Sequence, residues 1–326
     1  MSEIELRPYE EGDEEAINQL FNRAFGSERR VEEWRWKFGS GEIKPIMLAW
    51  DGDELVAQYG GIPRRLRVDG RRLGGATIVD VIGTAPGRRS LRRRSAYVRA
   101  CDAFIAHFAH GQFPICYGFP GRRALRLGLL AMGYGVSAPE PLTYLEREGD
   151  APMARWRRLR YSARPLGEEG GAIDELWRRV AEQYPVAMIR DAAHVKARLE
   201  GHPKGVAYHT FVVRPRPFGP PVAYAAFRID APVLRWIDLL WDHRHPGALR
   251  LLADISTLLA RQTECERQAL WVHNDAVASR WLERIGFETR PEPDGLVMIV
   301  RTFDPSIPPE QISGRLYVTM ADADLW

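Results

Sequence analysis

Val79-Asp80-Val81-Ile82 is a short apolar run that a single aspartate interrupts, and a Pro-Gly step follows it. Ile237-Asp238-Leu239-Leu240 repeats this pattern, with Asp238 placed 158 residues after Asp80, and a Pro-Gly step follows it too. Beyond each Pro-Gly step, apolar residues recur at helical spacing. They are Tyr97, Cys101, Phe104, Ile105 and Phe108 in the first segment, and Leu251, Leu252, Ile255, Leu258 and Leu259 in the second. A strand that leads into a long amphipathic helix is therefore predicted twice.

Two further matches flank this pair in the same order. The apolar stripe Ile17, Leu20, Phe21 and Ala24 recurs 156 residues later as Ile173, Leu176, Trp177 and Val180. A strand at 113–119 with a helix ending at Gly133 recurs as a strand at 269–273 with a helix ending at Gly286. Any two α/β units share some strand–helix order, but three ordered matches favour a duplicated domain.

Each copy reads as a strand, helices, three strands, a helix, a strand, a helix and a closing strand. This order predicts an α+β (mixed α/β) fold, in which each copy is a mixed, mostly antiparallel sheet flanked by helices. We predict an N-terminal domain at 1–147, a polar linker at 148–158 and a C-terminal domain at 159–303. The remaining residues, 304–326, are predicted to be a tail with one more strand at 315–319.

Composition restricts the class of protein. With 326 residues, 45% hydrophobic and 27% charged, the chain is neither disordered nor fibrous. We find no apolar run of about 20 residues and no signal-peptide pattern at the start, so we predict a cytoplasmic protein without a membrane segment. Cys101, Cys116 and Cys265 form no CxxC pair, and His243 with His245 lacks a third ligand, so no metal is expected. A net charge of only +3 argues against a nucleic acid as the partner.

The stretch from Ile82 to Arg94, IGTAPGRRSLRRR, joins the first strand to its helix. It resembles the loop with which the GNAT superfamily of N-acetyltransferases holds the pyrophosphate of coenzyme A. In the second copy Asn274, Ala278, Gly286 and Phe287 resemble a later helix of that family. The resemblance implies two tandem GNAT-like domains that use acetyl-CoA as co-substrate. It assigns these residues to coenzyme A: Ile82, Thr84, Gly87, Arg88, Arg89, Ser90, Arg92, Arg93 and Arg94.

The two copies depart from the family pattern to different degrees. Arg92 and Arg94 stand where the family has glycines, which narrows the loop but adds charge that phosphates favour. The second copy has Asp242-His243-Arg244-His245-Pro246-Gly247 at this point, with an acid and no phosphate-loop pattern. We therefore expect the first copy to bind coenzyme A and the second to serve as a scaffold or substrate wall.

Acetyl transfer to an amine needs a base for the ammonium proton and an acid for the leaving thiolate. Asp80 is the candidate base, with a purely structural role as the alternative. The resemblance implies an acidic tyrosine near Gly128 or Leu129, where this chain has none, so Tyr117 or Tyr134 is the substitute unless both are core aromatics. The C-terminal carboxylate of Trp326, or Asp322 or Asp324, could also act as the base, unless the acidic end is frayed.

The resulting hypothesis is an acyl-CoA-dependent N-acyltransferase, most simply an acetyltransferase, acting on a small amine or amino sugar. One alternative is a non-catalytic binding or scaffold protein, which the lost glycines at 92 and 94 suggest. Another is a tandem aminoacyltransferase that takes charged tRNA, which the arginine clusters at 64–72 and 88–94 suggest.

Overall fold

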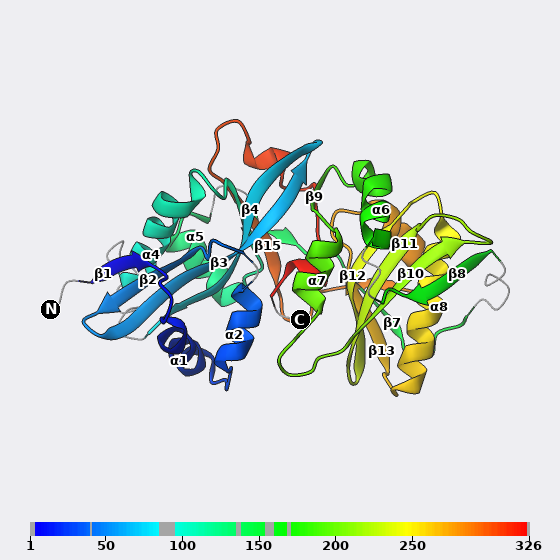
Figure 1. The fold of residues 1–326 in the computed structure, drawn as a ribbon, viewed down its shortest axis with the longest axis horizontal. Helices are drawn as coiled ribbons and strands as arrows, with labels where there is room; N and C mark the ends of the chain where they lie inside the picture. The colour runs from blue at the N-terminus through cyan, green and yellow to red at the C-terminus, as the bar shows by residue number, and fades with distance from the viewer. Residues whose placement is uncertain are drawn as a thin grey trace. The chain divides into compact units, whose positions relative to one another are not determined.

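The computed structural model describes residues 4–39, 41–84, 95–134, 138–153, 160–167 and 171–324. The chain divides into two compact units (Figure 1). Unit 1 comprises Met1–Leu66, Arg72–Pro141 and Asp294–Ser313, and unit 2 comprises Arg67–Arg71, Leu142–Pro293 and Gly314–Trp326. Each unit contains a mixed, mostly antiparallel sheet with helices packed on it, which confirms the predicted fold class.

Unit 1 follows the predicted order of elements. In chain order they are β1 (Glu5–Pro8), α1 (Glu14–Phe25), α2 (Val31–Phe38), β2 (Ile46–Asp51), β3 (Glu54–Val68), β4 (Arg71–Gly83), α4 (Ala96–Phe104), the π-helical turn η1 (Ile105–Ala109), β5 (Ile115–Gly118), α5 (Arg122–Ala131), β6 (Glu140–Pro141), β15 (Val297–Thr302) and η5 (Pro309–Gln311). β3 is one long strand, which a tight turn at Asp69-Gly70 joins to β4. Both turn residues have positive φ, as a two-residue hairpin turn requires.

The sheet of unit 1 has the order β1-β2-β3-β4-β5-β15-β6. Alternate residues of its strands face opposite layers, because side chains alternate along a strand. In β2, Ile46 and Leu48 pack with α1 and α2, whereas Met47 and Ala49 pack with α4 and η1. Helices therefore cover both faces of this sheet (Figure 1).

Unit 2 repeats this arrangement. Its elements are β7 (Tyr144–Glu148), β8 (Tyr161–Pro165), α6 (Gly171–Val180), η4 (Ala181–Gln183), β9 (Val186–Met188), α7 (Ala192–Leu199), β10 (Tyr208–Pro215), β11 (Ala223–Asp230), β12 (Val233–Trp241), α8 (Pro246–Gln262), β13 (Arg267–Trp271), α9 (Ala276–Glu283), β14 (Glu288–Arg290), β16 (Leu316–Tyr317) and η6 (Met320–Asp322). The sheet order is β14-β7-β13-β12-β11-β10-β8. As in unit 1, the pair that flanks the long helix is parallel, here β12 with β13 and there β4 with β5.

The closing strands come from unexpected parts of the chain. β15 follows the Leu142–Pro293 segment of unit 2 in sequence, yet it pairs with β5 and β6 inside unit 1. β7 follows the Arg72–Pro141 segment of unit 1 in sequence, yet it pairs with β13 and β14 inside unit 2. Arg147, at the start of the polar stretch, is buried in β7, where its guanidinium bonds the Gln268 side chain and the Ala253 carbonyl.

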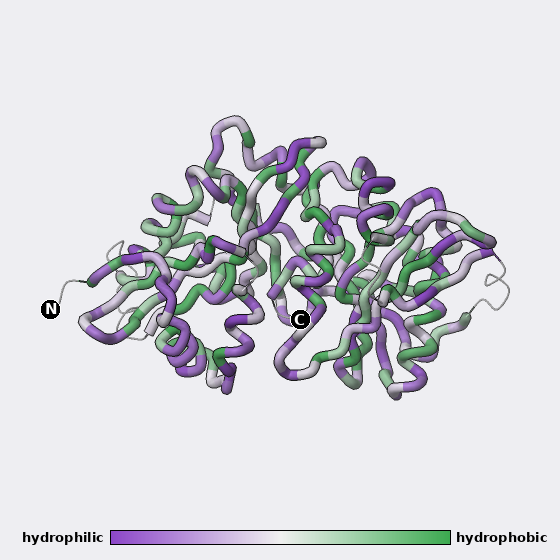
Figure 2. The backbone as a smooth tube through the Cα atoms, viewed as in Figure 1, coloured by the Kyte–Doolittle hydropathy of each residue, from purple (hydrophilic) through white to green (hydrophobic). Residues whose placement is uncertain are grey.

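The described helices are amphipathic or short rather than continuously apolar (Figure 2). None of the helices in the described ranges is long and apolar enough to span a bilayer.

Candidate functional site

The parallel strands β4 and β5 diverge within unit 1. They are paired from Gly75 with Ile115 to Ile78 with Gly118, where β5 ends while β4 continues to Gly83. Just past the last pair, Asp80 has φ of 47°, which is uncommon for a residue other than glycine. The regular strand geometry of β4 is therefore broken where its pairing with β5 stops.

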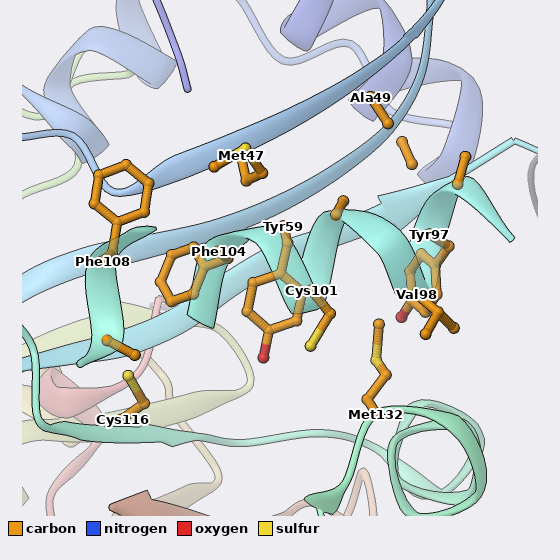
Figure 3. Packing of buried hydrophobic residues seen from close by; sticks show 14 of the residues in the cluster. Met47, Ala49, Tyr59, Tyr97, Val98, Cys101, Phe104, Phe108, Cys116 and Met132 are labelled. Atoms are coloured by element: carbon orange, nitrogen blue, oxygen red, sulfur yellow. The ribbon is translucent and has the colours of Figure 1, made fainter. Parts of the chain in front are cut away.

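A small, largely apolar cavity of about 20 Å³ adjoins this point. Its lining residues belong to unit 1: Tyr59, Ile78, Phe104, Ile105, Cys116, Tyr117, Gly118, Tyr134, Ile299, Arg301 and Phe303. Figure 3 shows part of the same face of the sheet, where Cys101 and Phe104 of α4 lie beside Tyr59 of β3. That volume holds roughly one water molecule, so a bound group would require side chains to move.

Two buried tyrosines meet at this cavity. The hydroxyls of Tyr59 and Tyr134 are 3.2 Å apart, and burial raises the pKa of both phenols above the ordinary value. The ring of Tyr134 lies against Gly128 of α5, where an added Cβ would be 1.9 Å from Tyr134 Cδ2. The space beside position 128, where the family resemblance implies a tyrosine, is thus filled by the ring of Tyr134.

A third tyrosine and two thiols lie at or near the cavity. Tyr117 is buried on β5 and its ring packs edge-on against Phe119 at 6.0 Å. Burial raises the pKa of the Cys116 thiol, which lines the cavity, to about 12, and that of the Cys101 thiol, in the same core cluster, to about 11. Such thiols are poor nucleophiles, so the cavity offers proton donors rather than a reactive thiolate.

Asp80 lies on the other face of the sheet from this cavity. Its Oδ2 accepts from Arg29 Nη1 at 2.6 Å and its Oδ1 from Lys37 Nζ at 2.7 Å. Burial would raise the pKa of Asp80, but Lys37 and Arg29 lower it below its ordinary value. The carboxylate is therefore charged and held by two cations, which lowers its affinity for the proton of a substrate.

The predicted coenzyme residues are only partly described. Ile82 is buried in the core against α1 and α2, so only its backbone could face a ligand. The Thr84 amide donates to the Val56 carbonyl at 2.8 Å and is thus engaged by β3. Gly87, Arg88, Arg89, Ser90, Arg92, Arg93 and Arg94 lie outside the described residues, as does Trp326.

The equivalent region of unit 2 is filled by its own tail. Tyr317 of β16 donates from its hydroxyl to the Leu239 carbonyl at 2.7 Å, and Val318 forms a bridge with His273 just beyond β13. Asp238, which repeats Asp80, is buried and bonded by Arg190 Nε at 2.9 Å. Trp236, Trp241 and Trp271 are buried as core side chains and do not form ligand-facing walls.

The residues that bind the two aspartates were not singled out from the sequence. Arg29 precedes α2 by two residues, and Arg190 precedes α7 by two residues. Lys37 and Arg198 also occupy equivalent positions, each one residue before the end of its helix. The internal repeat, extended to these basic residues, is the signal that could have found them.

Comparison with known proteins gives a family match for part of the chain and similar solved structures for most of it. Residues 5–123 match the family described as the acetyltransferase (GNAT) domain. A probable N-acyltransferase from Enterococcus faecalis V583 superposes with a TM-score of 0.69 at 12% identity, covering 93% of this chain and 73% of that one. A GCN5-related N-acetyltransferase from Anabaena variabilis ATCC 29413 gives a TM-score of 0.67 at 14% identity, with the same coverage of both chains.

The chain has the GNAT fold. N-myristoyltransferase from Saccharomyces cerevisiae, solved with bound myristoyl-CoA, is also similar, with a TM-score of 0.59 at 13% identity over 92% of this chain and 83% of that one. A search of curated proteins gives no match. The matched residues contain β4, β5 and the Arg29–Lys37–Asp80 cluster, whereas Tyr134, Ile299, Arg301 and Phe303 of the cavity lie beyond the match. No group of three or more potential metal ligands occurs within the described ranges.

Proposed function

We propose that the chain is an acyl-CoA-dependent N-acyltransferase whose active site lies in unit 1. The observation that carries the proposal is the divergence of β4 from β5 beside an apolar cavity, within the segment that matches the GNAT acetyltransferase domain. An acetyl group is the proposed donor group, because the side chains around the cavity would have to move least to admit it, and a small amine or amino sugar is the proposed acceptor. Unit 2 serves as a scaffold in this proposal, because its own tail occupies the equivalent region.

In the proposed reaction the amine nitrogen attacks the thioester carbonyl carbon. The substrate ammonium first loses one proton to give the free amine that attacks. The C–N bond then forms, the C–S bond breaks, and the nitrogen loses a second proton while the departing thiolate takes one up, so that one proton is released overall. Tyr134 and Tyr117 are the candidate donors to the thiolate, since both phenols are buried at the cavity. Asp80 remains the candidate base, acting directly or through water, although its two ion pairs make that role costly.

Coenzyme binding is the first test. We would follow thermal unfolding of the full chain with coenzyme A, with acetyl-CoA, and with ADP as a charge control. A ligand at 100 times its dissociation constant stabilises by about 2.7 kcal/mol. Each kcal/mol shifts the midpoint by about 2–4 °C for domains of this size, so several degrees are expected.

A shift that coenzyme A causes and ADP does not would support the proposal. Release of free thiol from acetyl-CoA in the presence of amines, measured by a thiol-reactive dye, would then identify acceptors. An equal shift with ADP, or none with any of the three ligands, would contradict coenzyme binding and with it the proposed function.

A further inference from the structure

Arg29 is held rigidly in a buried position in unit 1. Its side chain is 8% exposed, and its guanidinium carbon lies 3.5 Å from the centroid of the Phe21 ring. Nε donates to the Asn18 side chain at 2.8 Å, and Nη1 donates to Asp80. The Asn22 side chain accepts from the Arg29 amide and donates to the Arg29 carbonyl, both at 2.9 Å. Helix α1 thus fixes the backbone and the side chain of this arginine before any ligand arrives.

The remaining terminal nitrogen of Arg29, Nη2, is buried and has no hydrogen-bond partner among the described residues. A buried donor on a charged group that lacks a hydrogen-bond partner lowers the stability of the folded state, whereas a donor on the surface can bond to water. A protein that positions an arginine with this many contacts and leaves one donor unsatisfied has the features of a binding site for an acceptor group.

Unit 2 shows what fills the equivalent position. Arg190, which matches Arg29, also binds its strand aspartate, Asp238. Its Nη2 has partners, however, because the Asp322 carboxylate and the Thr319 hydroxyl of the tail both accept from it. Arg198, which matches Lys37, donates to the Ala321 carbonyl at 3.1 Å and to the Ala323 carbonyl at 3.0 Å.

In unit 2, therefore, both repeated cations hold a piece of the chain that carries a carboxylate. No segment of the described chain supplies such a carboxylate to Arg29 in unit 1. Arg29 and Lys37 there both pair with the carboxylate of Asp80.

We propose that Arg29 and Lys37 bind a carboxylate of the acceptor substrate, so that the acceptor is a small amine that also carries a carboxylate, such as an amino acid. This inference rests on the proposed function for the identity of the bound molecule as an acceptor. The Asp322 side chain in unit 2 is the built-in counterpart of that carboxylate. Lys37, whose side chain is 13% exposed, marks the side from which the ligand reaches the cluster.

The position of the Arg29–Lys37–Asp80 cluster relative to the apolar cavity suits two substrates that meet at β4. Ile78 packs with the α4 face of the sheet and lines the apolar cavity, whereas Asp80 holds the cations on the α1–α2 face. A thioester on the first face and a carboxylate-anchored amine on the second would approach the same break in the sheet.

The test uses the full chain and a panel of free L-amino acids, each paired with its carboxamide. Carboxamides keep the size and the amine but lose the negative charge. Binding would be followed by thermal unfolding and by the Nε–Hε resonance of Arg29 in nitrogen NMR, assigned from its absence in Arg29→Lys. The variants are Lys37→Met, which keeps the apolar stem, and Arg29→Lys. Arg23→Gln is the matched control, since Arg23 lies on α1 in an exposed pair with Glu54.

We expect at least one amino acid to raise the unfolding midpoint and shift the Arg29 resonance, while its carboxamide does neither. Affinity should fall about 10- to 100-fold in Lys37→Met and stay unchanged in Arg23→Gln. Once transfer is measured, KM for the carboxylate acceptor should rise by the same factor while KM for acetyl-CoA stays constant. Equal binding of acid and carboxamide, full binding by Lys37→Met, or no response to any amino acid would overturn the inference.

The same experiment separates this inference from the proposed function. Coenzyme A binding without any amino-acid response removes the carboxylate site and leaves the acyltransferase proposal intact. Amino-acid binding without coenzyme A binding would contradict the acyltransferase proposal and leave the carboxylate site intact.

Discussion

Asp80 is the residue on which the charge balance of the unit 1 cluster depends, because both Arg29 and Lys37 pair with its carboxylate. Asp80→Asn would leave both cations facing a neutral amide inside the protein. Removing one partner of a buried pair typically costs 3–5 kcal/mol, because the remaining charge stays desolvated. We expect the free energy of unfolding in urea to fall by about that much.

The surface pair of Arg23 with Glu54 supplies the comparison for this prediction. Glu54→Gln should change the stability by less than about 1 kcal/mol. If Asp80→Asn lowered the free energy of unfolding as little as Glu54→Gln, the cluster would contribute little to the stability of the fold. Loss of the acidic limb from the pH profile of transfer, at unchanged folding, would then favour Asp80 as the base.

Gly128 is the residue that determines where Tyr134 lies. A Cβ at position 128 would be 1.9 Å from Tyr134 Cδ2, so Gly128→Ala must displace the ring and separate its hydroxyl from that of Tyr59. Overpacking of this kind costs about 1–3 kcal/mol, which exceeds the roughly 1 kcal/mol that alanine gains in helix propensity. Chemical denaturation should therefore show a net loss of stability.

Gly111→Ala is the control for this substitution. An added Cβ there has no neighbour within 4 Å, and the backbone of Gly111 is not left-handed. We expect a change near zero or a slight gain. Gly128→Ala at wild-type stability would mean that the Tyr134 ring has room to move.

At the scale of elements, the repeat in the sequence accounts for much of the fold. The strand interrupted by an aspartate and its following helix occur in both units, as β4 with α4 and β12 with α8. The spacing of apolar residues predicted these elements because each of them buries one face, and the apolar residues on that face recur at the period of a helix or strand. The short strand expected at 315–319 is present as β16, within that range.

The pairing of distant elements was not visible in the sequence. The apolar residues of β15 show that it is buried, but not that it pairs with β5, which lies more than 170 residues earlier. Likewise, the contact of Arg29 with Asp80 spans 51 residues and depends on how α1 and α2 pack on the sheet. Such contacts depend on the three-dimensional fold, so the sequence located Asp80 but not its partners.

The tail elements β16 and η6 are predicted to stabilise unit 2 through Asp322. This carboxylate accepts from Arg190 and from the Thr319 amide, and the Arg190 side chain is fully buried. Asp322→Asn should lower the free energy of unfolding by about 3–5 kcal/mol, because Asp238 would then be the remaining counter-charge of Arg190 among the described residues.

Glu288→Gln provides the control, since Glu288 forms an exposed pair with Arg290 in the same unit. Hydrogen exchange would localise the effect of Asp322→Asn to β9, β12 and the tail. Unchanged exchange in those elements would show that the tail contributes little to unit 2.

At the scale of the whole molecule, the two aspartates predict how stability depends on pH. Burial alone would raise their pKa values, but Lys37 and Arg29 lower the pKa of Asp80, and Arg190 and His194 lower that of Asp238. A carboxylate with a lowered pKa binds fewer protons in the folded state than in the unfolded state, so its contribution is complete above the unfolded value of about 3.9. That contribution is lost as the pH falls through the folded pKa, so the free energy of unfolding should drop steeply below about pH 4.

His245 adds an earlier, smaller step with the same sign. Burial lowers its pKa below the ordinary value near 6.5, so the unfolded chain binds this proton first and stability begins to decline below that pH. Urea midpoints measured from pH 3 to pH 8 at constant ionic strength should therefore fall in two stages on acidification. His245→Gln should remove the upper stage, and Asp80→Asn, although less stable throughout, should show a shallower decline below pH 4. If a variant's stability fell with pH in parallel with that of the wild type, the substituted group would not cause the pH dependence. The loss of stability in acid would then come from the other carboxylates of the two units.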